Sequence, residues 1–223
     1  MSPFFKPRGY GTFADLARNE PEGDSWTRLI CSRPSAVLIA APHGGGIEQG
    51  TTEVARAVAG EEFALYSLVG LKARGNNVLH LTSTRFDDPV YLEMAARARV
   101  VVAIHGCEDA ERMVAIGGLH AALAQRIAAA LRTVAAHPAA DFATILGDTE
   151  HPGADARNLC NRGRDGRGVQ LEISRGLREA LFAGLSAAAR QRTTDLFVPF
   201  VLALRTALLD FERELKAGAP PIA

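Results

Sequence analysis

Residues 35–50 read SAVLIAAPHGGGIEQG, and this stretch guides the interpretation of the whole chain. An apolar run, SAVLIAA, leads directly to a histidine that is followed by three glycines. A short apolar run bounded by turn residues is typical of a strand buried on both faces of a parallel sheet. Glycine loses the most backbone entropy on folding, so adjacent glycines indicate a place where the backbone must bend sharply. The stretch therefore predicts a buried strand that ends at a functional loop.

The rest of the chain alternates between two kinds of pattern. Apolar runs that predict further strands occur at residues 62–70, 77–83, 99–106, 112–118, 141–147 and 168–174. Helical spacing occurs at residues 51–60, 87–98, 119–137, 177–184 and 193–218. Strands that alternate with helices favour an α/β fold with a mixed, mostly parallel sheet. We expect one domain over residues 1–223, with an irregular lead-in over about residues 1–25.

Composition excludes several classes of protein. The chain of 223 residues has 25 basic and 25 acidic side chains, whereas a nucleic-acid-binding protein usually carries a basic excess. Its three cysteines are Cys31, Cys107 and Cys160, too few and too scattered for a disulfide framework. No apolar stretch reaches the ~18 residues of a membrane span, and the N-terminus lacks the apolar core of a signal peptide. We expect a soluble cytoplasmic protein that binds neither nucleic acid nor membrane.

Two histidines and a glutamate stand where metal ligands are expected. His43 and Glu48 lie in HGGGIE, and His105 ends a second apolar run, RVVVAIHG. In open α/β sheets ligands bind beside the carboxyl ends of the strands, so these side chains should meet at one edge. Zinc binds histidine nitrogen and carboxylate oxygen, and catalytic sites use three protein ligands and keep one position for water. The pattern predicts one Zn2+ ion; the alternative for Glu48 is an acidic residue that stabilises a helix N-terminus.

A hydrolytic zinc site also needs a carboxylate that is not a ligand, to act as general base toward the metal-activated water. Glu172 lies within VQLEIS, flanked by apolar residues on a predicted central strand. A glutamate is costly to bury there unless it is paired or used. We therefore interpret Glu172 as the general base. His80 alternates with apolar residues, which favours a place in the core or beside a metal ligand over a ligand role.

Arginines gather near the predicted site and favour an anionic substrate. Arg162 and Arg164 lie in the loop before Glu172, Arg175 follows three residues after it, and Arg85 lies in LTSTRFDDP. Arginine binds carboxylates through two parallel hydrogen bonds, so these four residues are candidates for substrate binding. In the alternative interpretation the loop is simply solvated, and Arg175 forms a structural ion pair with Glu172.

Several blocks occur in a characteristic order: APHGGGIEQGTTEVARAVAG, LYSLVGLK, NNVLHLTSTRFDDP, AIHG and GVQLEIS. In these blocks, over roughly residues 35–185, the sequence resembles the poly-γ-glutamate hydrolases of bacteria and their phages. The resemblance implies a zinc-carboxypeptidase-like, three-layer α/β/α sandwich with one zinc at the sheet edge. It implies His43, Glu48 and His105 as the zinc ligands and Glu172 as the base. Members of this family cut the γ-amide bond between glutamates in a polyanionic capsule polymer.

The expected function is thus zinc-dependent hydrolysis of γ-glutamyl amide bonds, above all in poly-γ-glutamate. One alternative is a zinc amidase of small N-acylated acidic amino acids, of the N-formylglutamate type. Another is a protein that binds acidic polymers without cutting them. The chain departs from the usual setting of the family in its alanine- and arginine-rich composition and its lack of a secretion signal. A phage-type enzyme would be released by lysis instead.

Overall fold

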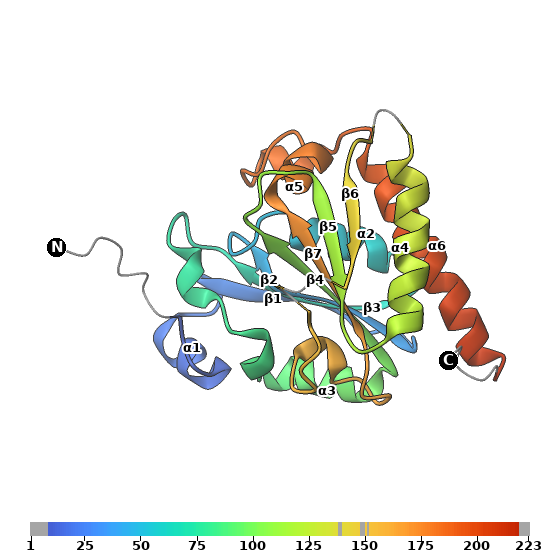
Figure 1. Cartoon of the computed structure of the whole chain (residues 1–223). Helices are drawn as coiled ribbons and strands as arrows, with labels where there is room; N and C mark the ends of the chain where they lie inside the picture. Colours follow the sequence, from blue (N-terminus) through green and yellow to red (C-terminus); the bar gives the residue numbers. More distant parts are fainter. Residues whose placement is uncertain (1–8, 138–139, 148–149, 151, 219–223) are drawn as a thin grey trace.

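The structure, a computed structural model, describes residues 9–137, 140–147, 150 and 152–218. Within these residues one seven-stranded sheet has the order β1-β3-β2-β4-β7-β5-β6 (Figure 1). Its strands are β1 Trp26–Cys31, β2 Val37–Gly45, β3 Ala64–Gly70, β4 Val100–Cys107, β5 Met113–Gly117, β6 Ala143–Leu146 and β7 Val169–Ser174. Strand β1 pairs with β3, and β5 with β7, in antiparallel fashion, while the other four pairings are parallel. The mixed, mostly parallel sheet is confirmed.

Helices cover both faces of the sheet, and this confirms the three-layer α/β/α sandwich (Figure 1). The elements of one layer are α2 Thr51–Ala59, α4 Ala121–Ala135, α5 Arg175–Leu181 and α6 Phe197–Lys216. The opposite layer holds α1 Phe13–Asn19 and α3 Pro89–Arg97. Alternate strand residues enter separate apolar clusters on the two faces, as the period of two in a strand requires. The α2 and α3 sides of the sheet are called its α2 face and its α3 face below.

The segment predicted as a strand over residues 77–83 is not one, and this prediction is wrong. It forms a 3-10 turn, η1 Asn76–Leu79, then an extended loop and a second turn, η2 Ser83–Arg85. Both edges of β3 are already paired, with β1 and β2, so that strand offers no edge for another. The apolar alternation instead reflects Leu79 and Leu81, which are buried against the α3 face.

The lead-in expected to be irregular over about residues 1–25 contains a helix. Residues 1–8 lie outside the described part of the chain, but α1 occupies Phe13–Asn19. Thr12 caps α1, because its side-chain oxygen accepts a hydrogen bond from the Asp15 backbone N–H at 3.1 Å. The buried Phe13 ring meets the Trp26 ring edge-on, with centroids 5.2 Å apart. This short helix therefore depends on a contact with β1 rather than on its own periodicity.

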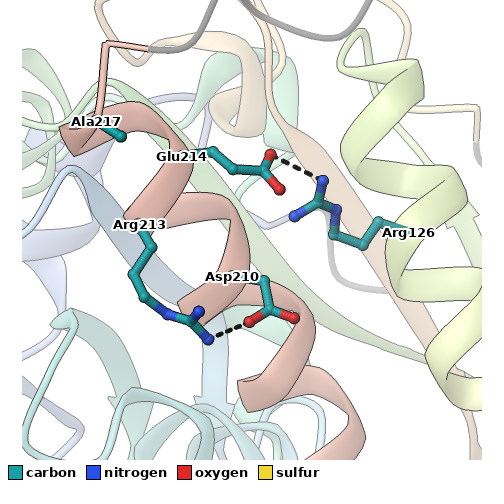
Figure 2. Close-up of a pocket in the computed structure, with 5 residues that line it drawn as sticks. All are labelled: Arg126, Asp210, Arg213, Glu214 and Ala217. Carbon is teal, nitrogen blue, oxygen red and sulfur yellow. Dashed lines mark hydrogen bonds and ion pairs between the residues drawn. The ribbon is translucent and has the colours of Figure 1, made fainter.

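The outer surface of the α4–α6 layer is a solvated helix surface. A cavity of about 650 Å³ lies there, lined by Arg126, Asp210, Arg213, Glu214 and Ala217 (Figure 2). Arg126 pairs with Glu214 at 2.8 Å, and Arg213 pairs with Asp210 (Figure 2). The charged groups of this cavity thus satisfy one another. Among the described residues, every helix is too short or too polar to cross a membrane.

Candidate metal centre and active site

An irregularity in β2 directs His43 to the α3 face of the sheet. Ala41 belongs to the apolar cluster on the α2 face, and strict alternation would place His43 there as well. Between Ala41 and Gly44, however, β2 gains one residue relative to β3. Such bulges re-aim side chains next to active sites. His43 consequently lies on the α3 face, where its ring stacks on His80 with centroids 3.7 Å apart.

Glycines after His43 make the return of the chain possible. A Cβ on Gly44 would lie 2.0 Å from the Thr52 hydroxyl oxygen, which is closer than any side chain allows. Gly45 has a φ of +64°, a conformation that favours glycine. The backbone N–H of Glu48 then donates to the His43 carbonyl at 2.8 Å. The loop thus folds back and places the Glu48 carboxylate beside the His43 ring.

Strands β4 and β7 deliver the other two site residues side by side. They pair in parallel, and His105 is the register partner of Glu172. Leu171 and Ile173 enter the apolar cluster on the α2 face, so alternation places Glu172 on the α3 face with His105. The sequence predicts His43, His105 and Glu172 at or near the carboxyl ends of strands. The structure brings these side chains to one edge of the sheet.

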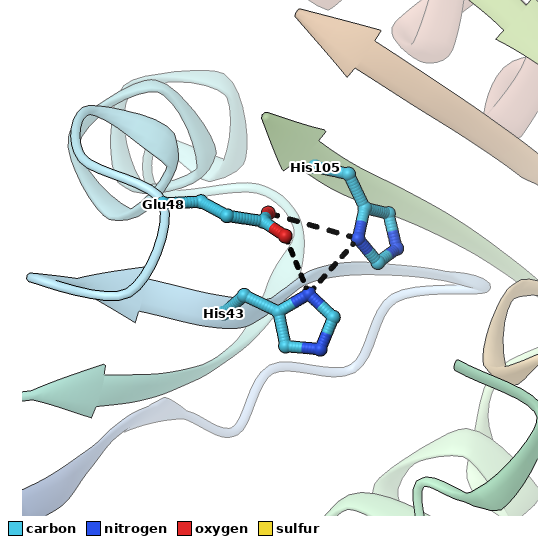
Figure 3. A group of neighbouring side chains, drawn as sticks. All are labelled: His43, Glu48 and His105. Carbon is cyan, nitrogen blue, oxygen red and sulfur yellow. Dashed lines mark hydrogen bonds and ion pairs between the residues drawn. The ribbon is translucent and has the colours of Figure 1, made fainter. Parts of the chain in front are cut away.

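Three donor atoms converge on a single point (Figure 3). The His43 Nδ1 atom lies 2.8 Å from Glu48 Oε1 and 3.2 Å from His105 Nδ1. His105 Nδ1 lies 3.8 Å from the second carboxylate oxygen, Glu48 Oε2. All three residues are buried. Two imidazole nitrogens and a carboxylate oxygen form a donor set that suits a transition-metal ion.

The hydrogen bonds of His43 support this assignment. Its Nε2 lies 2.7 Å from the Leu81 carbonyl oxygen, and a carbonyl only accepts, so Nε2 carries the hydrogen. In the neutral ring, Nδ1 then presents a lone pair to the Glu48 carboxylate, and the two would repel each other. A proton or a cation is therefore needed between His43 and Glu48. The residues present fit a bound metal ion.

The surroundings of Glu48 keep its carboxylate ionised. Burial by itself raises the pKa of Glu48, but the charge and hydrogen bond of His43, helped by His80 and His105, lower it well below its usual range. The backbone N–H of Gly106 donates to Glu48 Oε2 at 2.8 Å, and His80 Nε2 lies 3.2 Å from Oε1. The His80 side chain is 45% exposed, so of the two places expected for it, the core and a place beside a metal ligand, it does not occupy the core. His80 lies beside two of the candidate ligands instead.

A cavity of about 440 Å³ opens directly over the donor atoms. His43, Glu48 and His105 form part of its lining, with Glu172 and Gln170 beside them. Hydroxyl side chains of residues 82–84 and the loop segment 152–155 also line it. The candidate ligands and a separate carboxylate therefore share one space that is open to a substrate.

The four arginines predicted to bind substrate do not enter this cavity, and among the described residues none of its lining residues is basic except histidine. The Arg162 guanidinium donates to the Thr84 and Phe86 carbonyls at 3.3 and 3.0 Å. Arg175 pairs with two exposed carboxylates, those of Glu108 and Glu179, and both of these lie outside the cavity lining.

Arg164 and Arg85 differ in their distance from the site. The backbone N–H of Arg164 donates to the Ala98 carbonyl, which precedes the amino end of β4 and so lies away from the site. Arg85 is exposed on η2, next to the cavity-lining Thr84. Substrate contact by these arginines therefore stays a prediction, and Arg85 is the one that lies beside the cavity.

Sequence reasoning missed Arg178, which is fully buried in α5. Its guanidinium donates to the Gln49 and Cys107 carbonyls, each at 2.8 Å, and to the Ile173 carbonyl at 3.1 Å. These carbonyls belong to the residues just after Glu48, two after His105 and just after Glu172. One cation thus ties together the three segments that carry the site. In the sequence, an arginine in an amphipathic helix is normally a solvated residue, so no pattern indicated this role.

Comparison with known proteins gives consistent results. The family model described as poly-gamma-glutamate hydrolase matches residues 10–203. The Bacillus subtilis protein YndL is 36% identical over 197 residues, which cover 87% of this chain and 75% of YndL. A solved bacteriophage poly-gamma-glutamate hydrolase superposes with a TM-score of 0.85 and 31% identity, over 92% of this chain and 98% of that one. A zinc-free structure of YndL gives a TM-score of 0.83 and 33% identity, over 91% and 98% of the respective chains.

Proposed function

This chain belongs to the poly-gamma-glutamate hydrolase family, and from that membership we propose that it hydrolyses γ-glutamyl amide bonds in poly-γ-glutamate with the help of one zinc ion. The observation that carries the proposal is the convergence of His43, Glu48 and His105 beside Glu172 in one cavity. A binder of acidic polymers would have no need for a separate carboxylate beside a metal site.

His43, Glu48 and His105 would hold the zinc ion. Zinc–nitrogen bonds of about 2.0–2.1 Å in a tetrahedral site separate two nitrogen ligands by about 3.3 Å. The two histidine Nδ1 atoms lie 3.2 Å apart, which supports zinc binding at this point. When bound, zinc polarises the scissile carbonyl and makes the attacking water more acidic. Three protein ligands leave a position open for that chemistry.

Glu172 would act as general base and then as general acid. Its carboxylate takes a proton from the attacking water as the water oxygen bonds to the amide carbon. It passes this proton to the amide nitrogen as the carbon–nitrogen bond breaks, so the products are a carboxylic acid and an amine, which at neutral pH become a carboxylate and an ammonium group. Glu172 is only 8% exposed and lies beside His105 in the sheet register, which favours direct contact with a bound amide. We propose that Arg85, beside the cavity, meets a carboxylate of the flanking polymer.

The substitution Glu172→Gln tests this assignment while keeping the size of the side chain. We expect turnover of poly-γ-glutamate to fall by about 10²- to 10⁴-fold, the usual contribution of general acid–base catalysis. Zinc content, measured by atomic absorption, should stay at one ion per chain, because Glu172 is not one of the proposed ligands. Glu179→Gln, an exposed carboxylate on α5, is the matched control and should keep the wild-type rate. A Glu172→Gln protein with wild-type turnover would refute the mechanism.

A further inference from the structure

We propose that Asn158 and Gln170 are positioning residues that fix the Glu172 carboxylate through a hydrogen-bond chain of defined direction. The inference rests on the proposed function, because it takes Glu172 as the general base. None of the hydrogen bonds described below joins either amide to a candidate metal ligand. Both line the same cavity as Glu172.

The direction of the chain is set at its far end by a backbone group. The Cys160 N–H donates to Asn158 Oδ1 at 3.0 Å, and a backbone N–H cannot accept. The other end of the Asn158 amide is therefore its NH2 group, which donates to Gln170 Oε1 at 2.9 Å. The Gln170 amide is oriented in turn, so its NH2 group donates to Glu172 Oε1 at 3.0 Å. Glu172 Oε1 is thus held as an acceptor.

Burial makes this chain of hydrogen bonds stiff. Asn158, Gln170 and Glu172 are 6%, 4% and 8% exposed, so most of each side chain is packed against protein. An unsatisfied polar group in such a place costs about 1–3 kcal/mol. Gly153 packs directly on this chain, since a Cβ there would lie 3.1 Å from Gln170 Cβ. The amide of Gln170 therefore has one favourable orientation, and the plane of the carboxylate follows it.

The expected consequence lies in catalysis and not in metal binding. A donor to Oε1 stabilises the ionised carboxylate, which is the form that takes up a proton. It also fixes where that carboxylate points, and a misplacement of about 1 Å can cost about 100-fold in rate. Loss of the chain should lower kcat, leave the KM for poly-γ-glutamate nearly unchanged and leave zinc affinity unchanged. The loss of an amide that only stabilises the fold would not lower kcat while leaving KM and zinc affinity unchanged.

Gln170→Met provides the first test, because methionine keeps the length of the side chain and removes its hydrogen bonds. With poly-γ-glutamate as substrate and new amino groups as the signal, kcat should fall about 10- to 100-fold while KM changes less than about threefold. Zinc affinity, measured by competition with a chromophoric chelator, should match the wild type. Gln125→Met, the same change on the exposed side of α4, is the matched control and should keep the wild-type kcat. An unchanged kcat in Gln170→Met would overturn the inference.

The double variant with Glu172→Gln shows whether Gln170 acts through Glu172. Residues that act as a unit are strongly non-additive, so adding Gln170→Met to Glu172→Gln should cost almost nothing more. If the second change costs the same factor in both backgrounds, Gln170 acts independently and the inference is wrong. If Glu172→Gln alone keeps wild-type turnover, the proposed function fails and this inference fails with it. An inactive Glu172→Gln beside a fully active Gln170→Met would contradict the positioning role alone.

Asn158→Asp tests the direction of the hydrogen-bond chain without a change at Gln170. It also replaces Gln170→Met as the test if that variant does not fold. The introduced carboxylate can still accept from the Cys160 N–H, but it cannot donate to Gln170. The Gln170 amide would then turn its NH2 group toward this carboxylate and its oxygen toward Glu172, which removes the donor to the base. We expect a loss of kcat comparable to that of Gln170→Met, with wild-type zinc affinity. A wild-type kcat for Asn158→Asp would overturn the proposed chain.

Discussion

At the scale of single residues, the site depends on glycines as much as on the side chains that carry the chemistry. His105 is followed by Gly106, whose backbone N–H donates to Glu48 Oε2. A Cβ on Gly106 would lie 2.7 Å from Cζ of Arg178, and the guanidinium there is held by three carbonyls. The absence of a side chain at Gly106 thus lets the buried cation lie directly behind a candidate metal ligand.

The substitution Gly106→Ala should therefore disturb both stability and metal binding. Overpacking of a well-packed region costs about 1–3 kcal/mol, and the Arg178 guanidinium is fully buried and held by three carbonyls. We expect a lower free energy of unfolding in urea and a weaker affinity for zinc. Gly11→Ala is the control, because nothing lies within 4 Å of a Cβ at Gly11. A Gly106→Ala protein as stable as the control and with wild-type zinc affinity would contradict this account.

Residue types and strand ends were enough to predict His43, Glu48, His105 and Glu172 as one group, and the structure brings them together. The supporting contacts could not be predicted in the same way. Asn158 reaches Gln170 across 12 residues of sequence, and an amide has no spacing rule that would indicate such a partner. The predicted arginines show what proximity in sequence leaves open, because Arg175 follows Glu172 by three residues but pairs in the structure with the exposed carboxylates of Glu108 and Glu179.

At the scale of elements, periodicity predicted those strands and helices whose apolar patterns are regular. Strands β2, β4 and β7 lie within or overlap their predicted ranges, and α3, which lies within the predicted helix at residues 87–98, begins with Asp88 as its cap and Pro89 in its first turn. Strand β1 was missed because its sequence, WTRLIC, places polar residues among the apolar ones. The false strand at residues 77–83 shows that apolar alternation reports burial on one face and does not by itself report strand pairing.

Helix α5 has an effect on the site that exceeds its length of seven residues. Arg178 donates hydrogen bonds to the loop that follows β2 and to the carboxyl-terminal residues of β4 and β7, and a charged group makes each of these bonds stronger than a neutral one. Its removal would take a charged donor away from each of these three carbonyl oxygens. The helix therefore connects the stability of the fold to the geometry of the site.

Arg178→Met should lower the free energy of unfolding by about 2–4 kcal/mol, because hydrogen bonds from a charged donor contribute about 1.5–3 kcal/mol each and methionine still fills part of the space. Arg175→Met on the same helix is the matched control. Its guanidinium is half exposed, so its loss should cost less than about 1 kcal/mol. Equal effects of the two substitutions in chemical denaturation would refute the special role of Arg178.

At the scale of the whole molecule, the sheet order places parallel strands β2, β4 and β7 side by side, so their carboxyl ends meet at one edge. His43 comes from β2, Glu48 from the loop that follows it, and His105 from β4. A metal ion bound to all three would connect segments that are far apart in the unfolded chain. It would therefore bind the native state and raise its stability.

Zinc should raise the melting temperature of the metal-free protein. At free zinc 100-fold above the dissociation constant the gain is about 2.7 kcal/mol, which corresponds to about 5–10 °C for a chain of this size. Differential scanning calorimetry with and without zinc measures this gain. Glu172→Gln should show the same increase and His105→Ala should show none. A zinc-dependent increase that persists in His105→Ala would place the ion elsewhere.

The central claim is most directly tested by following the chain length of poly-γ-glutamate by size-exclusion chromatography. One sample contains the zinc-loaded protein, a second the protein after chelator treatment, and a third the treated protein with zinc restored. We expect shortening in the first and third samples and none in the second. A protein shown to hold one zinc ion per chain that leaves the polymer at its full length would contradict the account.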